Sequence, residues 1–168
     1  MSFSFDTLRF LLVDDNHHMR AIVAAILRSA GARTIREAQD GEEGLDSLRR
    51  YSADIAIADF KMTPVDGVEF VRQVRQGKEP YLPVIMMTGF SDRVRIVEAR
   101  DAGVTEILAK PITARSLLER VESVVLHPRP FIRSESYFGP CRRRTDRPVY
   151  TGEERRGVAA PRERLLEA

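Results

Sequence analysis

Short apolar runs alternate with longer amphipathic stretches along the first 126 residues of the chain. The apolar runs predict five β-strands, at Phe10–Val13, Thr34–Ala38, Ile55–Ala58, Val84–Met87 and Ile107–Ala109. The amphipathic stretches predict five helices, at His17–Ala30, Gly41–Arg50, Val68–Gln76, Asp92–Ala102 and Thr113–Val125. Strict alternation of strands and helices is typical of a parallel sheet covered on both faces. We therefore expect one α/β domain over residues 8–126.

Polar residues follow several of the predicted strands. Asp14 and Asp15 come after the first strand, Asp59 after the third, Thr88 after the fourth, and Lys110 with Pro111 after the fifth. Because the carboxyl ends of parallel strands meet at one edge, we expect these side chains to share a crevice. Three carboxylates in one crevice repel one another unless a cation lies between them, and Mg²⁺ prefers oxygen ligands.

These residues resemble the receiver domain of CheY-like bacterial response regulators. The resemblance covers about residues 8–126, and it rests on five separated elements: Leu-Leu-Val-Asp14-Asp15, Asp59, Met62 with Pro64-Val-Asp66-Gly67, Thr88-Gly89, and Lys110-Pro111. It implies a flavodoxin-like (βα)5 fold with strand order 2-1-3-4-5. It also implies signalling by phosphoryl transfer from a histidine kinase or phosphotransfer protein, without enzymatic activity beyond the domain's own phosphorylation and dephosphorylation.

The resemblance assigns a role to each matching position. Asp59 is implied to be the phosphoacceptor, while Thr88 and Lys110 contact the phosphoryl oxygens, with a cis bond between Lys110 and Pro111. Asp14, Asp15, Asp59 and the backbone carbonyl of Lys61 are implied to hold Mg²⁺. Two positions depart from the family pattern. Ile107 stands where an aromatic switch residue is usual, and the Lys61 side chain adds a cation beside the site.

The last 42 residues, 127–168, differ in composition from the rest of the chain. They contain ten arginines, no lysine, six acidic residues and five prolines, whereas residues 1–126 carry 17 basic and 19 acidic residues. The overall charge of +2 therefore hides a basic extension behind an acidic domain. Such a Pro-rich, charged segment predicts a largely disordered tail that becomes ordered when a ligand binds. It does not suggest a DNA-binding domain.

A Tyr-x-Gly-x-x-Arg-Arg unit occurs twice in this extension. The first copy consists of Tyr137, Gly139, Arg142 and Arg143. The second copy consists of Tyr150, Gly152, Arg155 and Arg156. Guanidinium groups grip phosphate oxygens and stack on rings, and they match O6 and N7 of guanine. Interleaved acids such as Asp146 can accept hydrogen bonds from guanine. The duplication therefore favours a guanine nucleotide of twofold character, such as cyclic di-GMP. Arg143-Arg144-Thr145-Asp146 adds an R-x-x-D pattern, and Arg143 to Arg147 adds an R-x-x-x-R pattern, as does Arg129 to Arg133.

With this extension, the chain resembles the Cle group of CheY-like cyclic di-GMP effectors. That resemblance implies that nucleotide binding to the extension promotes contact with the flagellar motor switch protein and tunes motility and surface attachment. Two other interpretations stay open: a phosphorylation-driven regulator whose tail contacts polyanions without specificity, and a phosphorelay shuttle or phosphate sink with an inert tail. Arg93, Arg95 and Arg100 of the fourth expected helix are interpreted as solvent-exposed rather than as nucleotide ligands.

The remaining features of the sequence concern the expected location of the protein in the cell. The chain has no run of about 18 apolar residues, so we expect no membrane span. The start of the chain lacks the pattern of a secretion signal, and Cys141 has no partner for an internal disulfide. We therefore expect a cytoplasmic protein that can be recruited to the flagellar base.

Overall fold

The centre of the molecule is a five-stranded parallel sheet of order β2-β1-β3-β4-β5. The computed structural model describes residues 4–89, 93–142 and 158–159. The strands are Arg9–Val13 (β1), Thr34–Ala38 (β2), Ile55–Asp59 (β3), Val84–Thr88 (β4) and Glu106–Ala109 (β5). β1 and β3 lie side by side and pair Val13 with Ala58, so both strands end at the same edge of the sheet.

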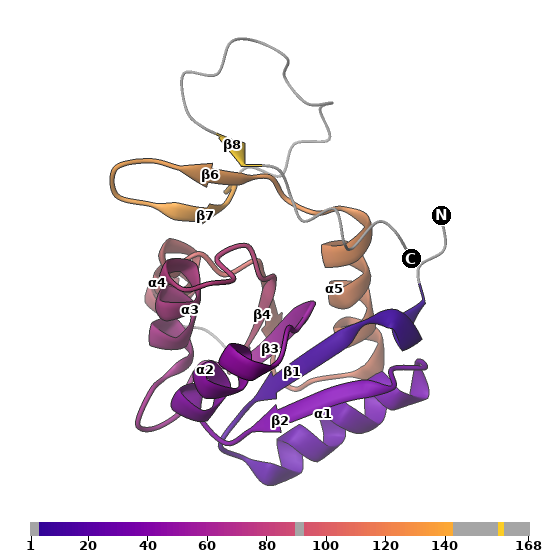
Figure 1. Cartoon of the computed structure of the whole chain (residues 1–168). Coiled ribbons are helices and arrows are strands. Elements are labelled where there is room, and N and C mark those ends of the chain that lie inside the picture. Colours follow the sequence, from indigo (N-terminus) through magenta and orange to yellow (C-terminus); the bar gives the residue numbers. More distant parts are fainter. Residues whose placement is uncertain (1–3, 90–92, 143–157, 160–168) are drawn as a thin grey trace.

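Helices cover both faces of the sheet (Figure 1). One face packs against His17–Ser29 (α1) and Ala114–Leu126 (α5), around a core that includes Phe10, Leu27 and Leu117. The other face packs against Gly41–Arg50 (α2), Gly67–Gln76 (α3) and Arg93–Ala102 (α4), around a core that includes Phe70 and Val84. The central strands β1, β3 and β4 are buried on both faces, as their continuous apolar sequences require, whereas the edge strand β2 is largely exposed.

Side-chain caps fix where the helices begin. Asn16, Asp40 and Asp66 each accept a hydrogen bond from a backbone N–H three residues later, at the starts of α1, α2 and α3. Thr113 and Ser116 form a reciprocal capping box at the start of α5. Since Asn16 and Asp66 lie in loops that follow β1 and β3, these caps also fix the chain around the strand ends.

The predicted α/β fold is confirmed. The five strands and five helices lie within one residue of the bounds expected from the hydrophobic pattern, and the strand order is the one that the resemblance implied. The structure adds a short 3-10 helix at Phe5–Thr7 (η1) that the pattern did not predict.

The first part of the extension departs from the expected disorder. Phe131–Arg133 (β6) and Phe138–Pro140 (β7) form an antiparallel hairpin, and Val158–Ala159 (β8) pairs with the other edge of β6. In Figure 1 this small sheet lies beyond the ends of α3 and α4. The expected disorder is therefore wrong for residues 131–140, where the hairpin buries apolar side chains such as Phe131 against the domain.

An aromatic cluster joins the hairpin to the domain. The ring of Tyr81, in the loop before β4, meets Phe131 and Phe138 edge-on, with centroids 5.3 and 5.4 Å away. Backbones also approach closely, because a Cβ on Gly139 would lie 2.8 Å from the Cα of Gly103. Gly103 itself has a φ of +96°, a conformation that favours glycine. The contact surface needs both glycines.

Candidate functional site

Three aspartates lie together at the carboxyl ends of β1 and β3. Ligand oxygens of Asp14, Asp15 and Asp59 all lie within 4.8 Å of one another. Asp14 and Asp59 are buried, whereas Asp15 is exposed. The structure thus brings together the three carboxylates that the sequence placed at two separate strand ends. Their proximity follows from the pairing of β1 with β3.

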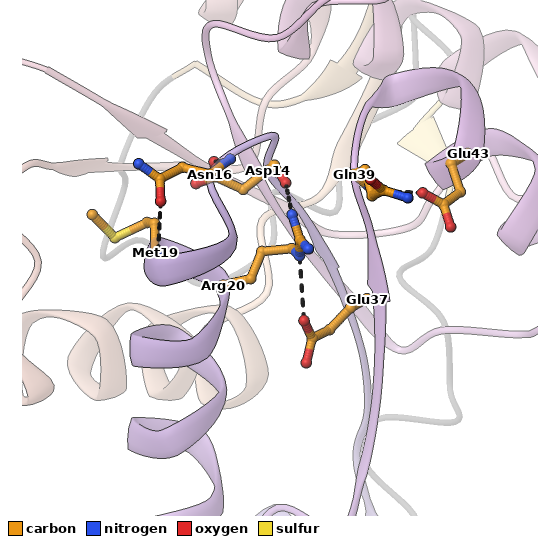
Figure 2. Close-up of polar contacts among 7 residues, drawn as sticks. All are labelled: Asp14, Asn16, Met19, Arg20, Glu37, Gln39 and Glu43. Carbon is orange, nitrogen blue, oxygen red and sulfur yellow. Dashed lines mark hydrogen bonds and ion pairs between the residues drawn. The ribbon is translucent and has the colours of Figure 1, made fainter.

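The loop after β1 is held by a set of polar contacts, drawn in Figure 2. Arg20 of α1 donates to the backbone carbonyl of Asp14 at 2.6 Å and pairs with Glu37 of β2 at 3.3 Å. The backbone N–H of Asn16 donates to Oδ1 of Asp14 at 2.8 Å. Asp14 is therefore fixed through both its backbone and its carboxylate, so its other oxygen has a defined position.

That other oxygen, Oδ2 of Asp14, is buried and accepts no hydrogen bond from the described residues. Burial raises the pKa of Asp14, and the nearby charges of Asp59 and Asp15 raise it further, against the lowering by the Asn16 hydrogen bond and Lys110. An unsatisfied carboxylate oxygen beside two more carboxylates is costly without a cation. The three residues therefore fit a hard divalent ion such as Mg²⁺.

Asp59 is in contact with a cation of the protein itself. Nζ of Lys110 lies 2.8 Å from Oδ1 of Asp59. The Lys110–Pro111 peptide bond is cis, as expected, and follows directly after β5. Thr88, at the end of β4, is also buried, and its hydroxyl donates to the Gly89 carbonyl at 3.1 Å. The residues at the carboxyl ends of β1, β4 and β5 therefore lie at the same edge of the sheet as Asp59.

Gly67 permits α3 to begin against the end of β3. A Cβ at this position would lie 2.2 Å from the backbone carbonyl oxygen of Asp59. The Gly67 N–H donates to the Phe60 carbonyl at 3.0 Å. Only glycine allows this approach, so Gly67 lets the loop that follows Asp59 return to the end of β3.

An open hollow of about 520 Å³ adjoins the acidic cluster. Its lining includes Asp15, Lys61 and, from α4, Arg95. The guanidinium of Arg95 lies over the Phe60 ring at 5.3 Å from its centroid, within the distance of about 6 Å typical of cation–π contacts. Lys61 is exposed, so its side chain brings positive charge to the entrance of the site.

This arrangement has counterparts among known proteins. Residues 10–122 match the sequence model of the protein family described as the response regulator receiver domain. The chain belongs to this family. It is 35% identical to the chemotaxis protein CheY-3 of Vibrio cholerae over 118 residues, which are 70% of this chain and 91% of that protein. It is 36% identical to the chemotaxis protein CheY of Pseudomonas aeruginosa, over 70% of this chain and 95% of that protein.

Solved structures show the same likeness. CheY4 of Vibrio cholerae superposes with a TM-score of 0.66 at 31% identity, over 70% of this chain and 98% of that one. A response regulator from Chloroflexus aurantiacus gives a TM-score of 0.67 at 30% identity, over 70% and 96%. The chain is therefore a CheY-like receiver, a signalling domain rather than a classical enzyme. The family match ends at residue 122, before the extension begins.

Three residues of the duplicated unit, Tyr137, Gly139 and Arg142, lie in the described part of the extension. The Tyr137 hydroxyl donates to the Pro140 carbonyl at 2.8 Å, and burial raises the pKa of this phenol. The guanidinium of Arg142 lies 4.4 Å from the Tyr137 ring centroid and pairs with Asp101 of α4 at 2.8 Å. Tyr137 and Arg142 therefore help to hold the hairpin on the receiver.

The other predicted nucleotide ligands divide into two groups. Arg129 pairs with Glu106 of β5 at 2.8 Å, and Arg133 lies over the Phe138 ring at 4.6 Å. Arg129 thus contacts the receiver, whereas the cation–π contact of Arg133 is with the hairpin itself. The remaining predicted ligands lie outside the described residues: Arg143, Arg144, Asp146, Arg147, Tyr150, Arg155 and Arg156.

Sequence reasoning missed Arg75, at the end of α3. It is 7% exposed, and its guanidinium donates to the carbonyls of Gly103, Leu82 and Pro80 at 2.7 to 3.0 Å. Burial lowers the pKa of Arg75 to about 10, so the group is still charged at neutral pH. Phe131 covers it, with the ring centroid 5.0 Å from the guanidinium carbon. The only sequence signal was a cation in a half-buried helix.

The described helices include none that is both long enough and apolar enough to cross a membrane.

Proposed function

We propose that this chain is a CheY-like response regulator that accepts a phosphoryl group on Asp59 and binds cyclic di-GMP through its Arg-rich extension. Nucleotide binding would promote contact with the flagellar motor switch protein, at the flagellar base in the cytoplasm. Phosphorylation would come from a histidine kinase or a phosphotransfer protein. The chemotaxis proteins among its relatives support a role in motility.

The contact between Lys110 and Asp59 beside the acidic cluster carries the phosphoacceptor assignment. A carboxylate oxygen of Asp59 would attack the phosphorus of the donor, forming an acyl phosphate as the donor's bond to phosphorus breaks. Lys110 would move from the carboxylate to the arriving phosphoryl oxygens, and the Thr88 hydroxyl would turn from Gly89 to the same group. Asp14, Asp15, Asp59 and the Lys61 carbonyl would hold Mg²⁺, which would screen the negative charges of the carboxylates and the phosphoryl group.

Attachment of the extension to the receiver supports the nucleotide assignment. Arg129 and Arg142 pair with Glu106 and Asp101, so charged contacts lie at both ends of the hairpin. The predicted ligands follow Arg142 directly in the sequence. A nucleotide that binds them would therefore act close to α4 and β5, and binding there can bias the receiver's conformation.

A second function is favoured by the completeness of the acidic site. Asp14, Asp15, Asp59 and Lys110 form the full set of charged groups that phosphoryl transfer requires. A regulator driven by phosphorylation alone, acting as a relay or a phosphate sink, would need no ligand in the extension. Its basic residues would then make nonspecific contacts with polyanions.

Calorimetry with two dinucleotides distinguishes these functions. The full chain should bind cyclic di-GMP, and cyclic di-AMP should bind at least about tenfold more weakly, because guanine offers O6 and N7 to arginine. The double variant Arg143→Ala/Arg147→Ala should lose most of this binding. Arg162→Ala/Arg164→Ala removes the same charge from the same extension outside the repeated units, and it should bind like the unaltered chain.

Nonspecific binding would look different. Equal affinity for both dinucleotides, with a steep fall as salt increases, would indicate a general polyanion contact and would support the second function. Equal losses in both double variants would lead to the same conclusion.

A further inference from the structure

Arg20, near the start of α1, connects two other segments of the receiver beside the acidic cluster. Its Nη1 donates to the backbone carbonyl of Asp14 at 2.6 Å, and its Nε donates to Oε2 of Glu37 on β2 at 3.3 Å (Figure 2). The Arg20 side chain is only 11% exposed. A guanidinium presents its donors in one rigid plane, so a single side chain can hold both partners at once. Arg20 therefore fixes the loop after β1 to the neighbouring edge strand.

The carbonyl that Arg20 binds belongs to the peptide unit between Asp14 and Asp15. A peptide unit is planar, so a contact that fixes its oxygen also fixes the direction in which the chain continues to Asp15. The Asp14 carboxylate has a further contact, since its Oδ1 accepts from the N–H of Asn16 at 2.8 Å. Asp15 is exposed, and its place in the cluster depends on this peptide unit. Arg20 thus acts on two of the three clustered carboxylates through the backbone that joins them.

The end of β2 that carries Glu37 is itself held on both sides. The carbonyl of Ala38 accepts from the Asp14 N–H at 3.2 Å. The N–H of Gln39 donates to the carboxylate of Glu43, on α2, at 2.7 Å (Figure 2). Glu37 is therefore a fixed anchor, and its contact gives the guanidinium that binds the Asp14 carbonyl a defined position.

The charge of Arg20 is directed away from the clustered carboxylates. Arg20 pairs with Glu37, whereas Lys110 contacts the cluster directly, at 2.8 Å from Oδ1 of Asp59. A guanidinium bound to the Asp14 carboxylate would compete with a metal ion for the same oxygens. Instead, Oδ2 of Asp14 accepts no hydrogen bond from the described residues. The Arg20 contact thus orders the backbone of the aspartates and leaves this oxygen for a metal ion.

We propose that Arg20 is a positioning residue of the metal site, which sets the affinity for Mg²⁺ through the Asp14–Asp15 peptide unit. The inference rests on the proposed function, in which Mg²⁺ serves the phosphorylation of Asp59. Loss of a residue that orients metal ligands typically weakens metal binding about 10- to 100-fold. An effect of charge alone has the opposite sign, because removal of a nearby cation strengthens the binding of another cation. The direction of the change therefore identifies the role of Arg20.

Titration of the full chain with Mg²⁺ alone, without a phosphodonor, tests the proposal. The backbone amide shifts of Asp14 and Asp15 in NMR spectra give the dissociation constant. Arg20→Met keeps an unbranched apolar stem but removes both donors and the charge, and it should weaken Mg²⁺ binding about tenfold.

Arg20→Lys separates charge from position and keeps the test open if Arg20→Met does not fold. It retains the charge but offers a single nitrogen, which cannot hold both partners in the same geometry. It should bind Mg²⁺ more weakly than the unaltered chain, whereas a role of charge alone predicts no change.

Arg9→Met is the matched control, because Arg9 carries the same group at the amino end of β1, away from the cluster. Its Nε and Nη2 each donate to the carboxylate of Asp54 at 3.0 Å. This variant loses the same charge and a comparable pair of hydrogen bonds. It should lower the urea concentration at the midpoint of unfolding, while its Mg²⁺ affinity stays that of the unaltered chain.

The outcomes separate the positioning role from the proposed function. Unchanged or tighter Mg²⁺ binding in Arg20→Met and Arg20→Lys would overturn the positioning role and leave the proposed function standing. Equal weakening in Arg9→Met would also overturn it, because the effect would then follow the loss of stability. An unaltered chain that binds Mg²⁺ but is not phosphorylated by acetyl phosphate would contradict the proposed function and leave the role of Arg20 intact. If the unaltered chain does not bind Mg²⁺, both the positioning role and the phosphoacceptor assignment fail.

Discussion

The two ends of the sheet are built in different ways. At the carboxyl end, Asp14, Asp15 and Asp59 crowd together with an unsatisfied buried oxygen, an arrangement that costs stability without a cation. At the amino end, beyond β4 and β5, the buried guanidinium of Arg75 has its donors satisfied by carbonyls and its face covered by Phe131. The carboxyl end carries the proposed phosphorylation site, whereas the amino end holds the extension on the receiver. Changes at one end should therefore leave the other intact.

Asp59→Asn should produce the largest effect, and only at the carboxyl end. Because the amide oxygen is a far weaker nucleophile than a carboxylate, phosphorylation by acetyl phosphate with Mg²⁺ should be abolished. Phosphate-affinity gel electrophoresis measures the phosphorylated fraction. Removal of Mg²⁺ with a chelator should abolish phosphorylation of the unaltered chain as well.

Asp46→Asn is the control for that loss, since Asp46 lies on α2 and its side chain is 56% exposed. It should be phosphorylated normally. Binding of cyclic di-GMP to Asp59→Asn should also stay unchanged, and a parallel loss of nucleotide binding would show that the two ends are not independent.

Phe131→Ala should have the next largest effect, at the opposite end. Phe131 is 4% exposed and contacts Tyr81, Phe138 and the guanidinium of Arg75. Its truncation should lower the free energy of unfolding by about 3–5 kcal/mol, because it leaves a cavity and uncovers a buried cation. Urea denaturation measures the change. Glu135→Ala, in the exposed turn between β6 and β7, should change stability little.

A loss below 1 kcal/mol in Phe131→Ala would contradict the docked position of the hairpin. Phosphorylation of Asp59 in this variant should proceed at the ordinary rate at temperatures where it is folded, because the aromatic cluster does not touch the acidic residues.

The two ends also differ in how far the sequence predicts them. The acidic site was predictable because each strand is an apolar run that ends in a polar residue, and one parallel sheet collects those ends at a single edge. The hairpin was not, because its strands have three residues each, Pro130 precedes the first and Pro140 ends the second, and the segment is rich in arginine. The apolar pairs Phe131-Ile132 and Tyr137-Phe138 were the available signal.

What makes those pairs a stable hairpin lies far away in the chain. Arg75, Tyr81 and Gly103 form the surface that Phe131 and Phe138 cover, at sequence separations of more than 25 residues. Local composition cannot report such contacts, and a Pro-rich charged segment is ordinarily read as disordered. The sharing of Asp101 between Arg100 and Arg142 was hidden from the sequence for the same reason.

Gly139→Ala should have an intermediate effect. A Cβ at this position would meet the Cα of Gly103 at 2.8 Å and the Tyr137 hydroxyl at 2.6 Å, so β7 has to move away from the receiver. We expect the free energy of unfolding to fall by about 1–3 kcal/mol. Thermal denaturation followed by circular dichroism measures it. Gly89→Ala is the matched control, because a Cβ there meets nothing within 4 Å. Equal stability of both variants would contradict the close approach of Gly139 to Gly103.

Arg142→Ala should have the smallest effect on stability and yet a clear effect on binding. Its ion pair with Asp101 is about half exposed, and such pairs contribute less than about 1 kcal/mol. If Arg142 also contacts the nucleotide, cyclic di-GMP affinity should fall about tenfold, a change larger than the loss of stability can explain. Urea denaturation and calorimetry on the same preparation give both values. Arg49→Ala removes a comparable exposed pair with Asp46 and should alter neither. A variant of Arg142 that binds the nucleotide normally would assign this arginine to the attachment of the hairpin alone, because the amino end of the sheet would then hold the extension without contributing to its ligand.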